Sequence, residues 1–185
     1  MWYVIQTLGG EEEQTANMIR KQVPSYYIED CFIPRRERMK KFHGCWHKVD
    51  EILFRGYVFV ISQQPEELYQ SLRHIPKLTK LLGREDGCFV SLNEEEPRLV
   101  QRLGDNKHRT QVSKIKLEEG EIAQVIDGPL KDYVGNIVKV NLHKREVVVR
   151  VVFMGREMDL KMGIEMVDAV ENKDENDRKA AGRET

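Results

Sequence analysis

Residues 45–62 read CWHKVDEILFRGYVFVIS, and their second half is almost entirely apolar. Leu53, Phe54 and the run 57–61 lack the alternation of a half-exposed strand, which predicts a strand buried on both faces. The charged half is preceded by His43-Gly44, a pair typical of a two-residue hairpin turn. We expect the apolar run to form the centre of a first sheet.

Helical patterns flank this strand. Residues 11–23 open with three acids and place Ala16, Ile19 and Val23 at helical spacing. A second helix is expected from Pro65 to Pro76, and a third after the capping residue Asn93, ending at Gly104. Further strands are expected at 2–8, 78–82 and 88–90. Residues 1–104 therefore read as an α+β domain with an antiparallel sheet.

The periodicity changes after a polar segment, residues 105–114, which has the composition of an interdomain linker. From Val147 to Met154 apolar residues alternate as in strands, and turns are indicated at Gly128-Pro129, 141–145 and Gly155-Arg156. The pattern predicts a small barrel of about five strands over residues 115–170. Residues 171–185 have the composition of a disordered tail.

Composition excludes several classes of protein. The 185 residues are 40% hydrophobic and 33% charged with a net charge of −1, which excludes disorder throughout and a uniformly basic nucleic-acid coat. No apolar run of about 18 residues or signal-peptide pattern is present, so we expect a soluble cytoplasmic protein with no membrane contact. Cys31, Cys45 and Cys88 lie far apart and are expected to be reduced thiols.

No constellation of residues supports an enzyme or a cofactor. Gly9-Gly10 precedes a helix, but three glutamates follow and the dinucleotide-binding spacing is absent. His43, Cys45 and His47, with distant Cys31, form the most metal-like cluster, yet they lack the usual zinc spacing and an orienting carboxylate for nucleophilic catalysis. We therefore expect no metal, cofactor or catalytic residue.

A basic ribbon is the strongest candidate for nucleic-acid contact. Six cations against one acid lie between Arg35 and Lys48. With a turn at His43-Gly44, Lys40 faces His47, Lys41 faces Trp46, and cations alternate with an aromatic ring that can stack on a base. The alternative is a solvated hairpin whose charges prevent aggregation. The candidate nucleic-acid residues are Arg35, Arg36, Arg38, Lys40, Lys41, Trp46, His47 and Lys48.

Four landmarks in order resemble the NusG family of transcription elongation factors. They are WYVIQT at the start, LFRGYVFV where the family has FPGYV, RHIPKLTKLLG, and GEIAQVIDGPLKDYVGNIVKV, which is similar to the KOW motif. The resemblance implies an N-terminal NGN domain that binds RNA polymerase and a C-terminal SH3-like KOW barrel. The KOW motif and partner-surface residues are Gly128, Pro129, Tyr133, Gly135 and Met154.

The resemblance also implies a docking site on the clamp coiled coil of the largest polymerase subunit. The matching residues are Leu53, Phe54, Gly56 and Tyr57, with Tyr3, Arg73 and Ile75 framing them. We expect Tyr57 to be the exposed member, because its hydroxyl can stay hydrated while its ring packs. Arg55 replaces the family's proline, and Met154 replaces an aromatic residue that binds a ribosomal protein or Rho, which leaves both partners open.

We interpret the chain as a monomeric elongation factor similar to the LoaP group of specialised antiterminators. It would suppress termination while its basic residues bind a hairpin in nascent RNA. The basic ribbon, Arg55 and Met154 favour this branch. Two alternatives remain: a general NusG that acts in pausing, Rho-dependent termination or ribosome coupling, and a KOW protein of RNA or ribosomes outside transcription.

Overall fold

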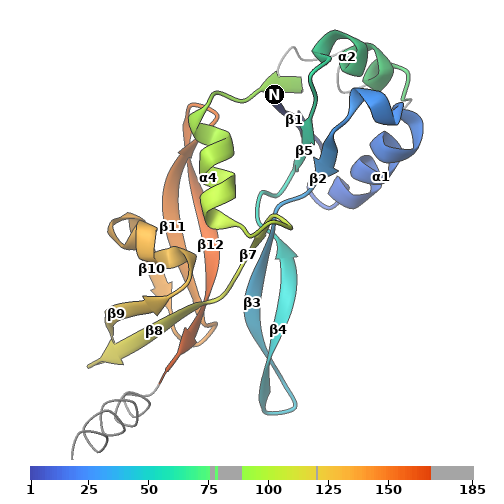
Figure 1. Ribbon diagram of the computed structural model, residues 1–185. Helices are drawn as coiled ribbons and strands as arrows, with labels where there is room; N and C mark the ends of the chain where they lie inside the picture. Colours follow the sequence, from blue (N-terminus) through green and yellow to red (C-terminus); the bar gives the residue numbers. More distant parts are fainter. Residues whose placement is uncertain (76–77, 79–88, 120, 168–185) are drawn as a thin grey trace, which may run out of the picture.

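The computed structural model describes residues 1–75, 78, 89–119 and 121–167 (Figure 1). For brevity we call residues 1–104 the first domain and residues 113–167 the second. The elements of residues 1–104 are β1 (Trp2–Gln6), α1 (Glu12–Gln22), η1 (Ser25–Tyr27), β2 (Asp30–Phe32), β3 (Arg35–Phe42), β4 (Cys45–Ile52), β5 (Tyr57–Ile61), α2 (Pro65–Arg73), β6 (Phe89–Ser91) and α4 (Glu95–Leu103). They are followed by β7 (Arg109–Thr110), β8 (Ser113–Glu118), β9 (Glu121–Asp127), η2 (Pro129–Asn136), β10 (Ile137–Asn141), β11 (Glu146–Phe153) and β12 (Arg156–Met166).

The first sheet has the antiparallel strand order β2-β5-β1-β6. Its central strand β5 is buried on both faces, as predicted, because different layers cover its alternate side chains. Val58 and Val60 share a core with Ile19 of α1 and with α2. Phe59 faces the other way, into a core shared with α4 and the C-terminal strands.

The three predicted helices are confirmed with boundaries set by local signals. Helix α2 begins at Pro65. The Asn93 side-chain oxygen accepts hydrogen bonds from the Glu95 and Glu96 amides at 2.9 and 3.2 Å, which caps α4. None of the described helices combines the length and apolarity needed to cross a membrane. The strand predicted at 78–82 is wrong at its one described residue, because Leu78 is helical and fully buried. The predictions at 79–82, at Cys88 and in the tail after 167 lie outside the described residues.

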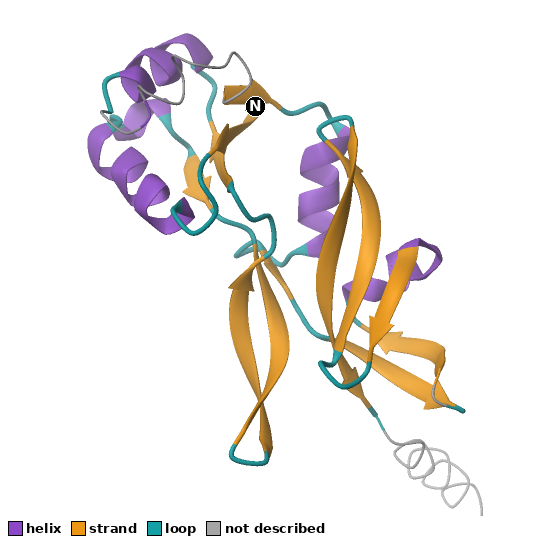
Figure 2. Cartoon of the chain, turned by 180° about the vertical axis from the view of Figure 1, so that it is seen from behind, coloured by secondary structure: helices purple, strands orange, loops and turns teal. Residues whose placement is uncertain are grey.

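Strands β3 and β4 form a hairpin, and β7 pairs with β3 in parallel to complete a small second sheet. The predicted register is confirmed: Lys40 pairs with His47 and Lys41 with Trp46. His43 and Gly44 have φ angles of 47° and 85°, which suit a two-residue turn. The hairpin projects from the body of the molecule with this turn at its free end (Figure 2).

The C-terminal strands have the order β10-β11-β12-β8-β9. Neighbours are antiparallel except β12 and β8, which are parallel. In residues 113–167, apart from position 120, no pairing joins the two edge strands β9 and β10. The strands therefore form an open sheet, and closure into an SH3-like barrel stays a prediction.

The two parts of the chain are docked on each other, an arrangement we call closed. A single apolar cluster contains Phe59 and Val100 from the first domain and Phe153 and Leu160 from the second. Helix α4 lies beside β11 and β12 (Figure 1). Gly163 of β12 touches the hairpin so closely that an added Cβ would lie 2.6 Å from the Glu37 carbonyl oxygen.

Candidate functional sites

The aromatic patch, defined as Leu53, Phe54, Gly56 and Tyr57, is formed as one cluster but is covered. Phe54 is 1% exposed and Leu53 is 8% exposed. Phe153, at the end of β11, lies against the patch with its ring centroid 4.8 Å from that of Phe54 and 6.3 Å from that of Tyr57. In the closed arrangement the patch is thus an interface between domains.

The expectation that Tyr57 is exposed was wrong. Tyr57 is 5% exposed, and the Arg156 guanidinium lies 5.8 Å from its ring centroid. Arg156 begins β12, directly after the turn that follows Phe153. Both covering residues come from the other end of the chain, so periodicity around Tyr57 carries no sign of them.

A buried carboxylate fixes the turn that carries the patch. The Gly56 amide donates to Oε1 of Glu12 at 2.7 Å, and the Gly56 carbonyl accepts from the Thr7 amide at 2.8 Å. Gly56 has a φ of 85°, and an added Cβ would lie 3.3 Å from the Thr7 carbonyl oxygen. Because Glu12 also accepts from the Gly10 amide at 2.7 Å, its buried charge is satisfied.

Tyr3 and Arg73 do not join the aromatic patch. Tyr3 packs on the helix-covered face of the sheet, where its ring stacks on Phe89 with centroids 4.9 Å apart. Its burial and nearby Glu66 raise its pKa. Arg73 ends α2, with its guanidinium 6.0 Å from the Tyr69 ring centroid. The two residues accordingly lie across the sheet from Phe54 and its neighbours.

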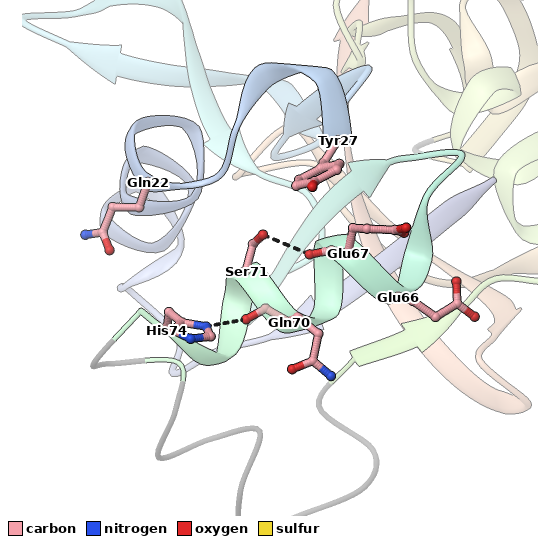
Figure 3. Close-up of a pocket in the computed structure, with 7 residues that line it drawn as sticks. All are labelled: Gln22, Tyr27, Glu66, Glu67, Gln70, Ser71 and His74. Atoms are coloured by element: carbon pink, nitrogen blue, oxygen red, sulfur yellow. Dashed lines mark hydrogen bonds between the residues drawn. The ribbon is translucent and has the colours of Figure 1, made fainter.

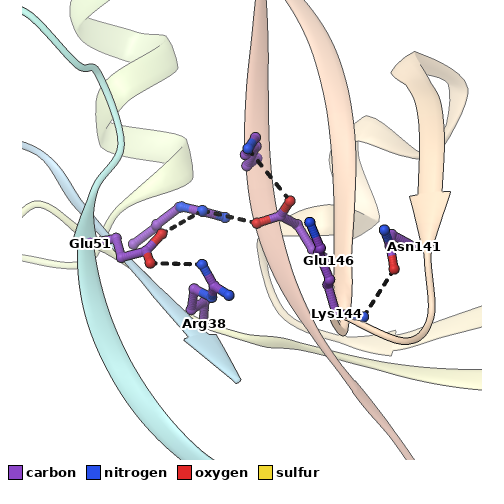
Figure 4. A network of polar contacts seen from close by, with 7 residues as sticks. Arg38, Glu51, Asn141, Lys144 and Glu146 are labelled. Atoms are coloured by element: carbon purple, nitrogen blue, oxygen red, sulfur yellow. Dashed lines mark hydrogen bonds and ion pairs between the residues drawn. The ribbon is translucent and has the colours of Figure 1, made fainter. Parts of the chain in front are cut away.

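The base of the hairpin is an ion-pair network rather than a free basic surface (Figure 4). Arg36 is 4% exposed and contacts Glu51 at 2.7 Å and Glu146 of β11 at 2.9 Å. Arg38 contacts the other oxygen of Glu51 at 2.8 Å. The assignment of Arg36 to nucleic-acid contact is therefore corrected: its charge is buried between two carboxylates and joins the domains.

Two further cations of the predicted set also have carboxylate partners. Arg35 pairs with Glu13 of α1, and Lys48 lies 3.5 Å from Glu37 while remaining half-exposed. These ion pairs neutralise much of the positive charge of residues 35–48. The cations that remain without a carboxylate partner in the described residues lie in the distal half of the hairpin.

The distal half carries exposed Lys40, Lys41 and His47. The Lys40 ammonium lies 4.9 Å from the ring centroid of Phe42, which is 43% exposed. Trp46 is partly buried because the Arg145 guanidinium stacks over it, 4.2 Å from the ring centroid. No residue of the described ranges forms an ion pair with either lysine.

The sequence reasoning did not assign Phe42 or the β10–β11 turn, residues 142–145, to this surface. Phe42 adjoins the hairpin turn, so an aromatic at a predicted loop tip was an available signal. The turn was identified, and the Asn141 side chain accepts the Lys144 amide at 2.9 Å (Figure 4). Its proximity to Trp46 depends on the docking of two domains, which no local pattern encodes.

The residues that the resemblance assigns to a KOW motif lie in and directly before η2 or in the turn after β11. Gly128 has a φ of 97°, and an added Cβ would lie 2.7 Å from the Ser113 Cα, so only glycine fits. The Ser113 hydroxyl accepts the Leu130 amide at 3.0 Å. Pro129 begins η2 and Tyr133 is buried within it, which raises the Tyr133 pKa. Gly135 has open space around its Cα and is not forced to be glycine by packing.

Met154 lies in the domain interface. It has a φ of 52° and forms the β11–β12 turn with Gly155. Its amide donates to Oε1 of Glu96 at 2.7 Å, while Oε2 of the same carboxylate accepts the Asn93 amide at 2.8 Å. One glutamate thus caps α4 and holds the turn of the other domain.

A cavity of about 440 Å³ lies between α1, η1 and α2 (Figure 3). Ser71 donates to the Glu67 carbonyl at 2.8 Å, and His74 Nδ1 lies 2.7 Å from the Gln70 carbonyl. Each side chain therefore bonds to the backbone of its own helix. The serine is not activated by the histidine, and the cavity holds no nucleophile with a base.

The thiols of Cys31 and Cys45 occupy different environments. Cys31 is buried in β2, and burial raises its pKa to about 11, whereas Cys45 is exposed beside the hairpin turn. The described residues contain no group of three potential metal ligands.

We expect Cys45 to react rapidly with a thiol reagent at neutral pH and Cys31 to react only on unfolding, because the thiolate is the reactive form. A Cys88→Ser variant isolates these two thiols for a colorimetric assay in native and denaturing buffer. Equal rates for both thiols in native buffer would contradict the burial of Cys31.

Comparison with known proteins agrees with this architecture. A family model described as "Transcription termination factor nusG" matches residues 1–101. Proteins named "Transcription termination/antitermination protein NusG" are 27% identical over 175 residues in Buchnera aphidicola and 25% identical over 178 residues in Thermus thermophilus. The matches cover 90% of this chain in both cases, with 94% and 96% of the relatives.

A solved structure described as "Domain interaction in Thermotoga maritima NusG" has a similar fold. Its TM-score is 0.51 at 24% identity, covering 88% of this chain and 92% of that one. The family model spans more than half of the 185 residues. On the strength of that match, the chain belongs to the NusG family of transcription factors.

Proposed function

We propose that this protein is a transcription elongation factor that binds RNA polymerase through the aromatic patch and promotes processive antitermination. The main observation in support of this proposal is that the C-terminal part of the chain covers the patch. Phe54 and Tyr57 meet Phe153 across the domain interface, while the helix-side core of the same sheet is a separate cluster. Domain separation would expose the patch and leave that core intact.

The chemistry of the patch suits the clamp coiled coil of the largest polymerase subunit as its partner. A few residues dominate the binding energy of protein interfaces, and tyrosine is enriched among them. In the closed arrangement this surface is occupied, so binding requires the open form. We propose that the protein is a cytoplasmic monomer with residues 115–170 as a KOW domain. The Met154 turn is its candidate contact for a ribosomal protein or Rho, and the replacement of an aromatic residue by Met154 leaves both partners open.

The distal half of the hairpin is the proposed contact for a structured nascent RNA. Lys40 and Lys41 are exposed and have no carboxylate partner in the described part of the chain. Phe42 and Trp46 add aromatic surface beside them. A surface on which cations alternate with aromatic rings suits RNA, because the cations can bind phosphates and the rings can stack on unpaired bases.

A general NusG role in pausing, Rho-dependent termination or ribosome coupling is the second candidate. The relatives' names cover termination and antitermination alike. The discriminating property is RNA selectivity: a specialised antiterminator binds a particular hairpin tightly, whereas a general factor binds RNA weakly and without preference.

Core polymerase capture tests the docking site. We expect Tyr57→Ser to reduce capture at least tenfold, because a buried aromatic anchor typically contributes about 2 kcal/mol or more to an interface. The matched control is Tyr26→Ser, which changes a tyrosine that is 70% exposed in η1. Undiminished capture by Tyr57→Ser, with its fold verified by circular dichroism, would show that polymerase docks elsewhere.

A further inference from the structure

We infer that the closed arrangement builds a phosphate-binding surface from both domains, which takes the backbone of a structured RNA. We call it the two-domain surface and define it as Lys41 and Trp46 of the hairpin with Lys144 and Arg145 of the β10–β11 turn. The inference rests on the proposed RNA contact of the hairpin, to which it adds a second domain and a dependence on closure.

The central contact is the stack of Arg145 on Trp46. The guanidinium lies 4.2 Å from the ring centroid, Arg145 Nε is buried without a hydrogen-bond partner, and the side chain as a whole is partly exposed. A guanidinium lying on an aromatic ring is held in place while its N–H edge stays available for a phosphate oxygen. The stack therefore presents a pre-organised donor rather than a mobile side chain.

The neighbouring cations point to the same ligand. Lys41 is the cross-strand partner of Trp46, and Lys144 precedes Arg145. Both lysines are exposed. No carboxylate of the described residues lies within ion-pair distance of Lys41, Lys144 or Arg145, whereas other arginines near the interface have carboxylate partners, as Arg36 and Arg109 do.

The geometry depends on closure. Glu146 follows Arg145 and is bound to Arg36, and Gly163, the cross-strand partner of Glu146, abuts Glu37 of the hairpin. If the domains separate, Lys144 and Arg145 leave the hairpin and the surface is halved. RNA bound across both domains must therefore favour the closed form, by the linkage between binding and conformation.

The test is titration of the full-length protein with a fluorescent RNA stem–loop and with an unstructured oligouridylate of equal length, at several salt concentrations. We expect Arg145→Gln to weaken stem–loop binding about tenfold, the value of one charge-assisted hydrogen bond, and to reduce the salt slope by about one. Lys144→Ala should weaken it as well. The matched control Lys139→Ala removes an exposed lysine from β10 and should change nothing.

A second variant tests whether RNA binding depends on the closed arrangement without changing any charge. Phe153→Ala keeps every cation but removes the ring that joins the domains, so it should weaken stem–loop binding by a similar factor. Hydrogen exchange of β11 and β12 verifies that the sheet remains folded.

The outcomes distinguish this inference from the proposed function. If stem–loop binding is lost in Lys40→Ala/Lys41→Ala but unchanged in Arg145→Gln and Phe153→Ala, the hairpin alone binds RNA and the two-domain surface is wrong. If the unaltered protein binds neither RNA, the two-domain surface and the RNA contact of the hairpin are both wrong, whereas polymerase docking through the aromatic patch is decided by the capture experiment. Equal affinity for the two RNAs, lost in Arg145→Gln, supports a phosphate-binding surface but overturns its preference for structured RNA.

Discussion

Phe153→Ala is expected to raise the affinity for core polymerase about tenfold or more. A partner that binds only the open form has an apparent affinity reduced by the fraction of molecules that are open. Truncating a buried phenylalanine lowers the free energy of unfolding by about 3–5 kcal/mol. If about 1.4 kcal/mol of this loss weakens the contact between the domains, the ratio of open to closed molecules rises tenfold. Biolayer interferometry with immobilised polymerase measures the change directly.

Val152→Ala is the matched control for this variant. Val152 precedes Phe153 in β11 but is 69% exposed, so its truncation leaves the interface unchanged. We expect Phe153→Ala to change the two measured affinities in opposite directions: the affinity for polymerase should rise and the affinity for the RNA stem–loop should fall. A simple loss of fold would lower both, and unchanged polymerase affinity would mean that the patch is not the docking site.

Arg36→Ala is expected to lower the free energy of unfolding by about 3–5 kcal/mol, because it leaves the carboxylate of Glu146 buried without its closest cation. Glu146 is 7% exposed, and after the substitution its nearest described cation is Lys161, at 3.9 Å. Urea denaturation followed by circular dichroism gives the value. Arg36→Met should cost less than Arg36→Ala, because its side chain fills more of the vacated space.

Arg150→Ala serves as the comparison for Arg36→Ala. Arg150 also contacts a carboxylate, Asp159 at 2.8 Å, but the pair is exposed on the outer face of β11 and β12. Exposed pairs contribute little because water screens them. If Arg36→Ala proves no more destabilising than Arg150→Ala, the Arg36 network is not a structural element of the closed form.

Local signals were sufficient to predict the hairpin, the central strand and the helices α1, α2 and α4, but not the short helices η1 and η2. The hairpin register followed from one dipeptide, His43-Gly44, because a two-residue turn fixes every pair in both strands. Asn93 predicted the start of α4 because a side-chain oxygen can satisfy free amides at a helix start. The continuous apolar run of β5 predicted burial on both faces. In the structure α1 and α2 cover one face of the strand, and α4 with the C-terminal strands covers the other.

The docking of the domains could not be predicted in this way. Phe54 and Phe153, or Arg36 and Glu146, are separated by about a hundred residues, and no periodicity links them. Counting cations therefore overstated the basic surface at Arg36, whose partner lies in the other domain. For the same reason Trp46 was predicted as an open stacking platform, although Arg145 already covers it.

The shielding of the aromatic patch has a practical consequence for recombinant work. Residues 1–104 produced alone would present Phe54, Tyr57 and Phe59 to water without the cover that Phe153 provides. Contiguous exposed apolar surface promotes self-association. We expect the truncated polypeptide to precipitate at concentrations where the intact chain stays in solution, so that the second domain acts as a built-in solubility partner for the first.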